Sequence, residues 1–203
     1  MRLPFGSHHP PKDQPADLPP AVCIVGKKDS GKTTLTVALA AELRRRGRRV
    51  ATIKHGHHAF ETDEPGRDSW RHFNEGGAEA TIMCGTGKVA LTMRIDGEPD
   101  PEALIAAFYA GRGYDVVLVE GFKHGALPKI EVFRRARHEH PVYDPDDHDA
   151  AGRFIAIVTD DAEFSARLPV IALDPDDPLA GAHVDRVATL VEDRVIGIVG
   201  DEL

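Results

Sequence analysis

The stretch Gly26-Lys27-Lys28-Asp29-Ser30-Gly31-Lys32-Thr33, continued by Thr34, decides the fold of this chain. It has the Walker A spacing G-x-x-x-x-G-K-[ST], in which a glycine-rich loop surrounds the phosphates of a nucleotide. The apolar residues 21–25 before it predict a buried strand. Residues 35–46 after it, rich in Ala, Leu, Glu and Arg, predict a helix that ends at Gly47. Strand, loop and helix in this order predict a phosphate-binding loop, or P-loop.

The residue types in this stretch suit a nucleoside triphosphate together with Mg²⁺. Glycines allow the loop to curve so that its N–H groups point inward, and the start of the following helix adds partial positive charge. Lys32 is expected to reach the β- and γ-phosphates, and the Thr33 hydroxyl to supply one ligand to Mg²⁺. We therefore predict that the loop residues bind the nucleotide: Gly26, Lys27, Lys28, Asp29, Ser30, Gly31, Lys32, Thr33 and Thr34.

Length, composition and charge limit the class of protein. A chain of 203 residues, 41% of them hydrophobic, is long enough to bury a core. We expect a single P-loop domain over residues 21–203 and a disordered lead-in over residues 1–20, which contain six prolines. The net charge of −8 argues against nonspecific nucleic-acid binding. The sequence shows neither a membrane-length apolar run nor a signal peptide, so we expect a soluble, cytoplasmic protein.

The remaining apolar runs predict a mostly parallel sheet. Residues 49–54 follow the first helix as a second strand, which gives a right-handed βαβ unit with parallel strands. Further strands are expected at 115–121, 129–134, 154–158 and 169–174, helices at 67–74, 101–111 and 179–193, and an edge strand at 195–199. These elements predict an α/β fold of the P-loop NTPase type, in which a mostly parallel sheet lies between two helix layers.

Three segments fall outside this alternation of strands and helices. Residues 80–84 and 89–95 are β-rich and flank a glycine-containing turn, so they predict an inserted β-hairpin. Such a hairpin forms either an antiparallel edge of the main sheet or a surface that pairs with another subunit. Cys84 in this hairpin and Cys23 in the first strand are expected to be buried free thiols. Residues 138–152 are acidic and aperiodic and are expected to form a mobile surface loop.

Two acidic residues at strand ends extend the predicted site. Glu120 ends an apolar strand, where a carboxylate could hold Mg²⁺ through water or orient an attacking water, so Lys32 and Glu120 are the candidate catalytic residues. Gly121 would let the backbone approach the γ-phosphate. Asp160 follows a later strand and could accept hydrogen bonds from the N1 and amino groups of guanine. The alternative for both acids is ordinary strand-end and turn chemistry.

A histidine-rich segment follows the second strand. His55, His57 and His58 lie close to Glu61 and Asp63, and imidazole is a ligand for Zn, Ni or Cu. No cysteine joins them to complete a tetrahedral site. The segment therefore either ligates a metal or forms a loop that contacts phosphate or substrate beside the nucleotide.

Four segments occur together in an order that resembles a known family: the P-loop, residues 53–58 (Ile-Lys-His-Gly-His-His), residues 65–70 (Pro-Gly-Arg-Asp-Ser-Trp) and residues 118–124 (Leu-Val-Glu-Gly-Phe-Lys-His). Over about residues 21–135, the chain resembles the molybdopterin-guanine dinucleotide biosynthesis adaptor (MobB) family. The resemblance implies a P-loop GTPase-like fold and a homodimer that binds GTP with Mg²⁺. It further implies that Thr33 and Glu120 serve the metal ion.

The resemblance also implies the partners of the protein. Members are regarded as adaptors or weak GTPases that work alongside the guanylyltransferase that attaches GMP to molybdopterin, and molybdopterin-carrying proteins are further candidate partners. In this interpretation the partner enzyme carries out the nucleotide transfer. Slow hydrolysis is expected from the residues as well, because no Gln or Arg is evident beside Glu120 to complete a phosphoryl-transfer site.

Two other functions stay open on the residues alone. A metallochaperone GTPase would use the loop His55–His58 to carry Ni or Zn. A small-molecule kinase that uses ATP would need an arginine lid, for which Arg134, Arg135 and Arg137 are the candidates.

Overall fold

The computed structural model describes residues 18–56 and 63–197, and these residues form two compact units. The sheet unit comprises Met1–His55 and Pro101–Leu203 as far as they are described, and the hairpin unit comprises the described part of Gly56–Asp100. Most of the predicted disordered lead-in, residues 1–20, lies outside the described residues. The single domain expected over residues 21–203 stays a prediction.

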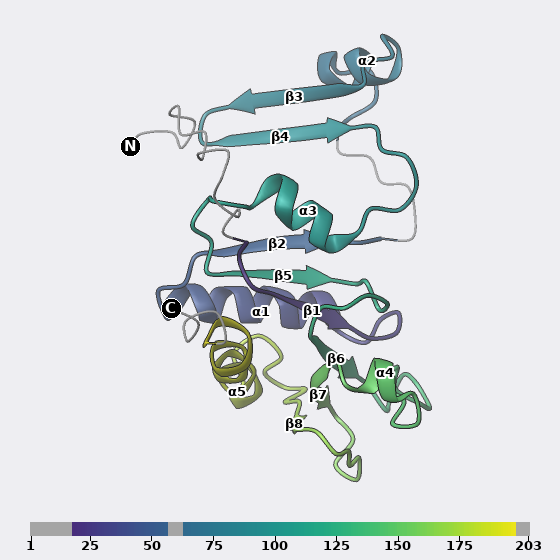
Figure 1. Cartoon of the computed structure of the whole chain (residues 1–203), viewed down its shortest axis with the longest axis vertical. Coiled ribbons are helices and arrows are strands. Elements are labelled where there is room, and N and C mark those ends of the chain that lie inside the picture. Colours follow the sequence, from purple (N-terminus) through teal and green to yellow (C-terminus); the bar gives the residue numbers. More distant parts are fainter. Residues whose placement is uncertain (1–17, 57–62, 198–203) are drawn as a thin grey trace. The chain divides into compact units, whose positions relative to one another are not determined.

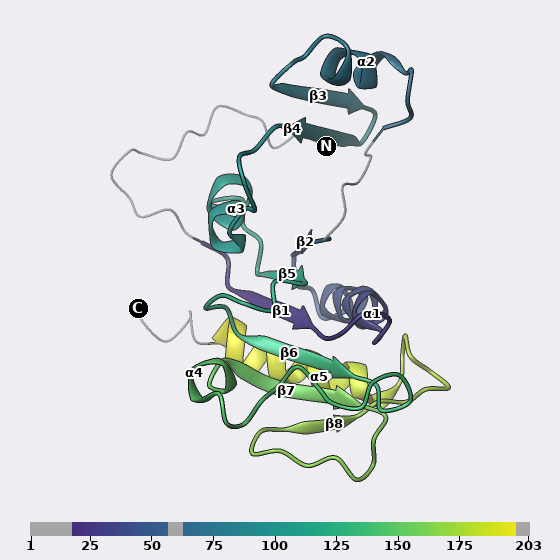
Figure 2. The same cartoon turned by 90° about the vertical axis from the view of Figure 1, so that its right-hand side faces the viewer.

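Within the described residues, the sheet unit contains a six-stranded sheet of order β2-β5-β1-β6-β7-β8 (Figures 1 and 2). All neighbouring strands pair in parallel. The strands are β1 (Ala21–Val25), β2 (Val50–Lys54), β5 (Val116–Glu120), β6 (Lys129–Phe133), β7 (Phe154–Thr159) and β8 (Val170–Ala172). Because all strands run the same way, the loops that follow β1, β2, β5 and β6 leave from one edge of the sheet.

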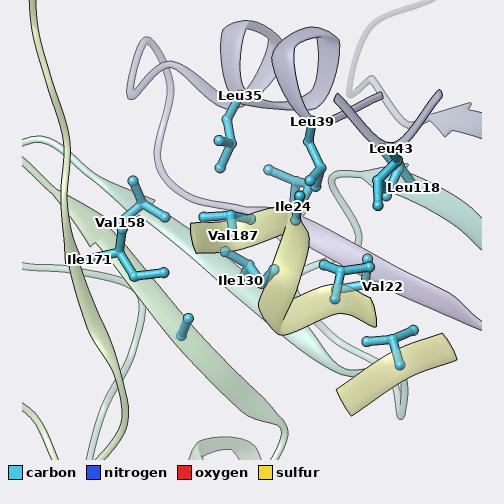
Figure 3. Close-up of a cluster of buried hydrophobic side chains, with 14 of the residues drawn as sticks. Val22, Ile24, Leu35, Leu39, Leu43, Leu118, Ile130, Val158, Ile171 and Val187 are labelled. Atoms are coloured by element: carbon cyan, nitrogen blue, oxygen red, sulfur yellow. The ribbon is translucent and has the colours of Figure 1, made fainter. Parts of the chain in front are cut away.

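Helix α1 (Lys32–Arg45) and helix α5 (Ala182–Val191), which continues into the π-helix η1 (Glu192–Ile196), cover one face of the sheet. Figure 3 shows this core: leucines of α1 meet valine and isoleucine of β1 and a valine of α5. The side chains that form it are Leu35, Leu39, Leu43, Val22, Ile24 and Val187. Each fully buried aliphatic side chain stabilises the fold by about 1.5–3 kcal/mol, so this layer fixes the start of α1 against β1.

Helix α3 (Pro101–Phe108) and the segment around α4 (His148–Ala151) cover the other face. Ile105 of α3 and Tyr143 belong to the same buried cluster as Cys23 and Val25 of β1. The predicted α/β architecture, a parallel sheet between two covering layers, is therefore confirmed. Across the described residues, no helix combines the length and apolar character that a membrane span would need.

The hairpin unit contains α2 (Asp68–Asn74), β3 (Ala80–Gly85) and β4 (Lys88–Met93). Strands β3 and β4 pair antiparallel, with Ile82 opposite Leu91, so the predicted hairpin is confirmed. In the described chain they form a two-stranded sheet of their own, so the first of the two alternatives, an antiparallel edge of the main sheet, is wrong, and pairing with another subunit stays a prediction. Cys84, predicted to be buried, is exposed because both faces of this narrow sheet are largely uncovered within its unit.

Two further predictions are corrected by the structure. The expected edge strand at 195–199 is wrong in its described part, because Val195 lies in η1 and is buried. Val187, Val191 and Val195 recur every fourth residue, which is helical spacing, and they pack in one core. Residues 138–152, predicted to form a surface loop, include the buried Tyr143 and the short helix α4.

Candidate functional site

The P-loop leaves β1 at Gly26 and enters α1 at Gly31, and both glycines are required by the backbone. Gly26 has φ of 147°, and a Cβ atom there would lie 2.5 Å from the carbonyl oxygen of Val132 on the neighbouring strand β6. Gly31 has φ of 98°, a region that side-chain-bearing residues rarely adopt. Asp29 also has positive φ, 59°, although it is not a glycine. Such backbone conformations concentrate at functional sites and ligand clamps.

The start of α1 is suited to bind an anion. Gly31 is the N-cap residue and provides no side-chain hydrogen bond to the first turn. The N–H groups of that turn therefore have no capping side chain, and the helix adds partial positive charge at this end. A pocket of about 450 Å³ opens here. Its lining residues are Lys28, Asp29, Gly31, Lys32, Thr33, Thr34 and Glu120.

Lys32 lies across the loop that it is predicted to serve. Its Nζ donates a hydrogen bond to the carbonyl oxygen of Lys27, at 2.7 Å. Burial lowers the pKa of Lys32, and the nearby carboxylate of Glu120 acts in the opposite direction. The ammonium therefore lies in a partly desolvated position beside the helix start, where a bound phosphate would compensate for its lost hydration.

Thr33 and Glu120 meet although they are 87 residues apart in the sequence. The Thr33 hydroxyl donates to Glu120 Oε1 at 2.7 Å, and Glu120 is only 7% exposed. The cause is the parallel pairing of β1 with β5, which places Glu120 at the carboxyl end of the strand next to the P-loop. A hydroxyl and a carboxylate are the oxygen ligands that Mg²⁺ prefers, so the residues present fit this metal ion.

Lys54, to which the sequence analysis assigned no role, belongs to the same cluster. Its Nζ lies 3.1 Å from Glu120 Oε1 and 3.3 Å from Thr33 Oγ1. Strand β2 pairs with β5 in the register that sets Lys54 opposite Glu120. In the sequence Lys54 ends a predicted strand and lies in the segment 53–58 that resembles the family, but neither feature gives the strand order that brings it to Glu120.

The turn after β5 holds Glu120 in place. Gly121 has φ of 103° and donates its N–H to the carbonyl oxygen of Ile24, at 3.0 Å. The N–H of His55 donates to the carbonyl oxygen of Glu120 at 2.9 Å, and the His55 ring stacks on Phe122 with centroids 4.4 Å apart. A Cβ atom at Gly121 would lie 3.1 Å from that of His55. The glycine thus makes room for His55, and its predicted approach to a γ-phosphate stays a prediction.

The histidine segment cannot be followed as a whole, since His57 and His58 lie outside the described residues. In the chain from 18 to 56 and from 63 to 197, no three His, Cys, Asp or Glu side chains gather as a metal site would require. Glu61 is also outside the described residues, and Asp63 belongs to the hairpin unit.

Asp160 lies at the end of β7 and does not line the P-loop pocket. Its carboxylate accepts a hydrogen bond from Arg134 Nε at 2.6 Å and another from the backbone N–H of Arg135 at 2.7 Å. Each carboxylate oxygen can accept a second bond, so the predicted contact with guanine stays a prediction. Arg134, a candidate for the arginine lid of a kinase, is paired with this acid.

A second contact that the sequence did not reveal joins residues 138–152 to the P-loop. His138 Nε2 lies 2.7 Å from the carbonyl oxygen of Lys28. Glu131 of β6 is buried and accepts hydrogen bonds from the backbone N–H groups of Val142 and Tyr143, at 2.5 and 2.7 Å. Burial raises the pKa of Glu131, and these hydrogen bonds act against that shift. The segment is thus anchored on the strand next to the P-loop.

Comparisons with known proteins identify the family of this chain. The family model MobB, described as molybdopterin guanine dinucleotide synthesis protein B, matches residues 21–160. The chain is 37% identical over 126 residues to the molybdopterin-guanine dinucleotide biosynthesis adapter protein of Escherichia coli (strain K12), an alignment that covers 60% of this chain and 70% of that protein. It is 39% identical over 118 residues to the adapter protein of the same name from Haemophilus influenzae, covering 57% and 64%.

Solved structures that are similar to this chain are also MobB proteins. The crystal structure of a MobB protein homolog from Bacillus stearothermophilus aligns with a TM-score of 0.59 and 27% sequence identity, covering 86% of this chain and 99% of that chain. The crystal structure of Bacillus subtilis MobB aligns with a TM-score of 0.59 and 28% identity, covering 84% and 97%.

Proposed function

The chain belongs to the molybdopterin guanine dinucleotide synthesis protein B family, and from this premise we propose that it is a GTP-binding adaptor of molybdopterin guanine dinucleotide biosynthesis. In this proposal it assists the guanylyltransferase that attaches GMP to molybdopterin and hydrolyses GTP only slowly. The observation that supports it best is the contact between Thr33 and Glu120, which both line the P-loop pocket. A hydroxyl and a carboxylate are the groups that a Mg²⁺–nucleotide complex requires at these two positions.

Each group of the site has a defined task in this proposal. The N–H groups at the start of α1 bind the phosphates, and the ammonium of Lys32 leaves the carbonyl oxygen of Lys27 for a phosphate oxygen. Thr33 and Glu120 would hold Mg²⁺, whose charge neutralises the β- and γ-phosphate oxygens when it is bound. Neither Gln nor Arg is among the residues that line the described pocket, and this supports slow hydrolysis.

Titration calorimetry with GTP and ATP, each with and without Mg²⁺, tests the nucleotide site. The wild type is expected to prefer GTP in a Mg²⁺-dependent manner. Lys32→Ala is expected to lose measurable affinity while it keeps its melting temperature, and Lys88→Ala, an exposed lysine of β4, serves as the matched control. A folded Lys32→Ala protein with unchanged affinity would contradict the site, and a preference for ATP would contradict guanine recognition through Asp160.

The role of Glu120 in hydrolysis is tested separately from binding. Glu120→Gln preserves the shape of the side chain but removes the negative charge that a metal ion or an attacking water would use. We expect the variant to bind GTP and to lose most of its residual phosphate release. Normal turnover by this variant would remove Glu120 from catalysis.

We extend the proposal to a homodimer formed through the hairpin unit. Large apolar side chains are exposed on both strands of the hairpin: Ile82, Met83, Val89, Leu91 and Met93. Ile82 alone is 66% exposed. Two-stranded hairpins are marginally stable by themselves, and grouped apolar exposure is typical of interaction surfaces. Light scattering should show a dimer for the wild type and a monomer for Ile82→Asp. A monomeric wild type would contradict the proposed homodimer.

A further inference from the structure

Three polar atoms from three different elements meet at the P-loop. Thr33 Oγ1 lies 2.7 Å from Glu120 Oε1, and Lys54 Nζ lies 3.1 Å from that carboxylate oxygen and 3.3 Å from the hydroxyl. The lysine ammonium thus contacts both oxygens that the proposed function assigns to Mg²⁺. Two cations cannot share these oxygens at contact distance without strong mutual repulsion.

We propose that Lys54 is a placeholder for Mg²⁺: its ammonium neutralises Glu120 in the nucleotide-free protein and is displaced towards the phosphates when the Mg²⁺–nucleotide complex binds. This inference rests on the proposed function, because it assumes that Thr33 and Glu120 hold the metal ion. It adds a role for Lys54, which contacts the site from β2 and does not line the described P-loop pocket.

Burial explains why the carboxylate of Glu120 needs a cation beside it. Glu120 is 7% exposed, and a carboxylate removed from water without a counter-charge is costly. Lys32 is held elsewhere, because its Nζ donates to the carbonyl oxygen of Lys27. Among the described residues, Lys54 is therefore the lysine whose ammonium lies within hydrogen-bonding distance of the Glu120 carboxylate. It supplies the compensating charge.

The exposure of Lys54 explains how it can leave. Its side chain is 64% exposed, whereas that of Glu120 is 9% exposed, so departure of the lysine breaks little packing. Lysine carries its charge on a flexible four-carbon stem and can follow a nearby anion without movement of the backbone. A triphosphate in the pocket would provide that anion, and the same cation would then add to the charge that stabilises the phosphates.

This arrangement couples the metal ion to the nucleotide. Without nucleotide, divalent cations must displace Lys54 into water and lose the competition for Glu120. With nucleotide, the displaced ammonium gains phosphate contacts, so each ligand improves the affinity for the other. Removal of the lysine is therefore expected to strengthen metal binding to the nucleotide-free protein and to weaken the dependence of GTP binding on Mg²⁺.

The test measures Mn²⁺ binding to the nucleotide-free protein by the loss of the free-ion EPR signal, since Mn²⁺ accepts the same oxygen ligands as Mg²⁺. Lys54→Met is expected to raise Mn²⁺ affinity roughly tenfold, the value expected for loss of one competing charged hydrogen bond. Lys123→Met is the matched control, because it removes one exposed positive charge near the site without removing this contact. It is expected to change the affinity by less than about twofold.

Two further variants keep the result interpretable. Lys54→Gln removes the charge but keeps a polar side chain, and it replaces Lys54→Met if that variant does not fold. The double variant Lys54→Met/Glu120→Gln should lose the gain in Mn²⁺ affinity, because the carboxylate that the metal uses is gone. A gain that persists in the double variant would overturn the inference.

Calorimetry with GTP on the same proteins separates this inference from the proposed function. If the wild type binds GTP with Mg²⁺ but Lys54→Met matches the Mn²⁺ affinity of the wild type or of Lys123→Met, the placeholder role is refuted and the function stands. If the wild type shows no Mg²⁺-dependent GTP binding, the proposed function fails, whatever the Mn²⁺ result. Tighter Mn²⁺ binding together with a smaller effect of Mg²⁺ on GTP affinity supports both.

Discussion

Replacement of Gly26 by alanine should both destabilise the fold and disable the P-loop. The added Cβ atom would lie 2.5 Å from the carbonyl oxygen of Val132 and 2.6 Å from Ser30 Oγ, closer than real Cβ contacts. Val132 belongs to β6, which is paired with β1 on one side and β7 on the other, so its backbone cannot easily retreat. The substitution also places a side chain at φ of 147°.

The size of the effect follows from two contributions. A non-glycine residue in this backbone region costs about 1–3 kcal/mol. Overpacking against neighbours that cannot move costs about 1–3 kcal/mol more. Together they predict a loss of roughly 2–6 kcal/mol in the free energy of unfolding, a large part of the 5–15 kcal/mol that is typical of a folded protein. Relief of the clash must displace Ser30 or Val132, and either movement changes the loop that binds phosphate.

Urea unfolding followed by circular dichroism measures the first effect, and GTP calorimetry at low temperature, without urea, measures the second. Gly47→Ala is the matched control, because Gly47 has φ of 89° but a Cβ atom there would meet nothing within 4 Å. It carries the backbone cost without the clash, so about 1 kcal/mol is expected. Equal destabilisation by the two substitutions would refute the clash with Val132, and full GTP affinity in Gly26→Ala would refute its link to the phosphate loop.

Three other predictions concern the chemistry of single side chains. In the folded protein Cys23 should stay protected from a thiol reagent until unfolding, because burial raises the pKa of its thiol to about 12. Cys84 is paired with Val89 on the hairpin that is proposed to form the dimer, so it should react readily in the monomeric Ile82→Asp variant and more slowly in the wild type. Arg46 forms ion pairs with acidic residues on α1, α5 and η1, so Arg46→Met should lower the free energy of unfolding by about 1–3 kcal/mol. Arg44→Met, at an exposed position of α1, should be near neutral. Hydrogen bonds from Arg45 and Arg46 lower the pKa of Glu42 from 4.5 to about 2. The contribution of ionised Glu42 to the free energy of unfolding is therefore complete above about pH 4.5 and is lost as the pH falls towards 2, and Glu42→Gln should flatten that part of the stability–pH curve.

Local sequence patterns correctly predicted individual strands, helices and the hairpin. The strand before the P-loop, the helix after it and the hairpin are where the residues placed them, and the family resemblance is confirmed by the comparisons. Both Cys23 and Cys84 lie in apolar runs, but only Cys23 is buried, since it lies in a sheet covered on both faces. Burial therefore depended on what packs against the strand, which a run of apolar residues does not specify.

The candidate site was predicted incompletely for a related reason. Thr33 and Glu120 were both predicted to serve Mg²⁺ because each carries a recognisable signal, a Walker A hydroxyl and an acid that ends an apolar strand, and the structure places the two side chains in contact. Lys54 and His138 carry no such signal. Their contacts arise because β5 lies between β1 and β2, and because residues after β6 fold back over the loop. Strand order is a long-range property, and the local pattern of a single sequence does not contain it.

The strand order also explains what supports the strained backbone of the P-loop. Strand β1 lies between β5 and β6, so the loop is supported from both neighbours. On the β5 side, Glu120 accepts the hydroxyl of Thr33; on the β6 side, Glu131 anchors the segment whose His138 contacts the carbonyl oxygen of Lys28. Asp29, at φ of 59°, lies between these two supports. Contacts from both neighbouring strands thus hold the loop that is proposed to bind phosphate, and a loop held in this way loses little conformational freedom on binding.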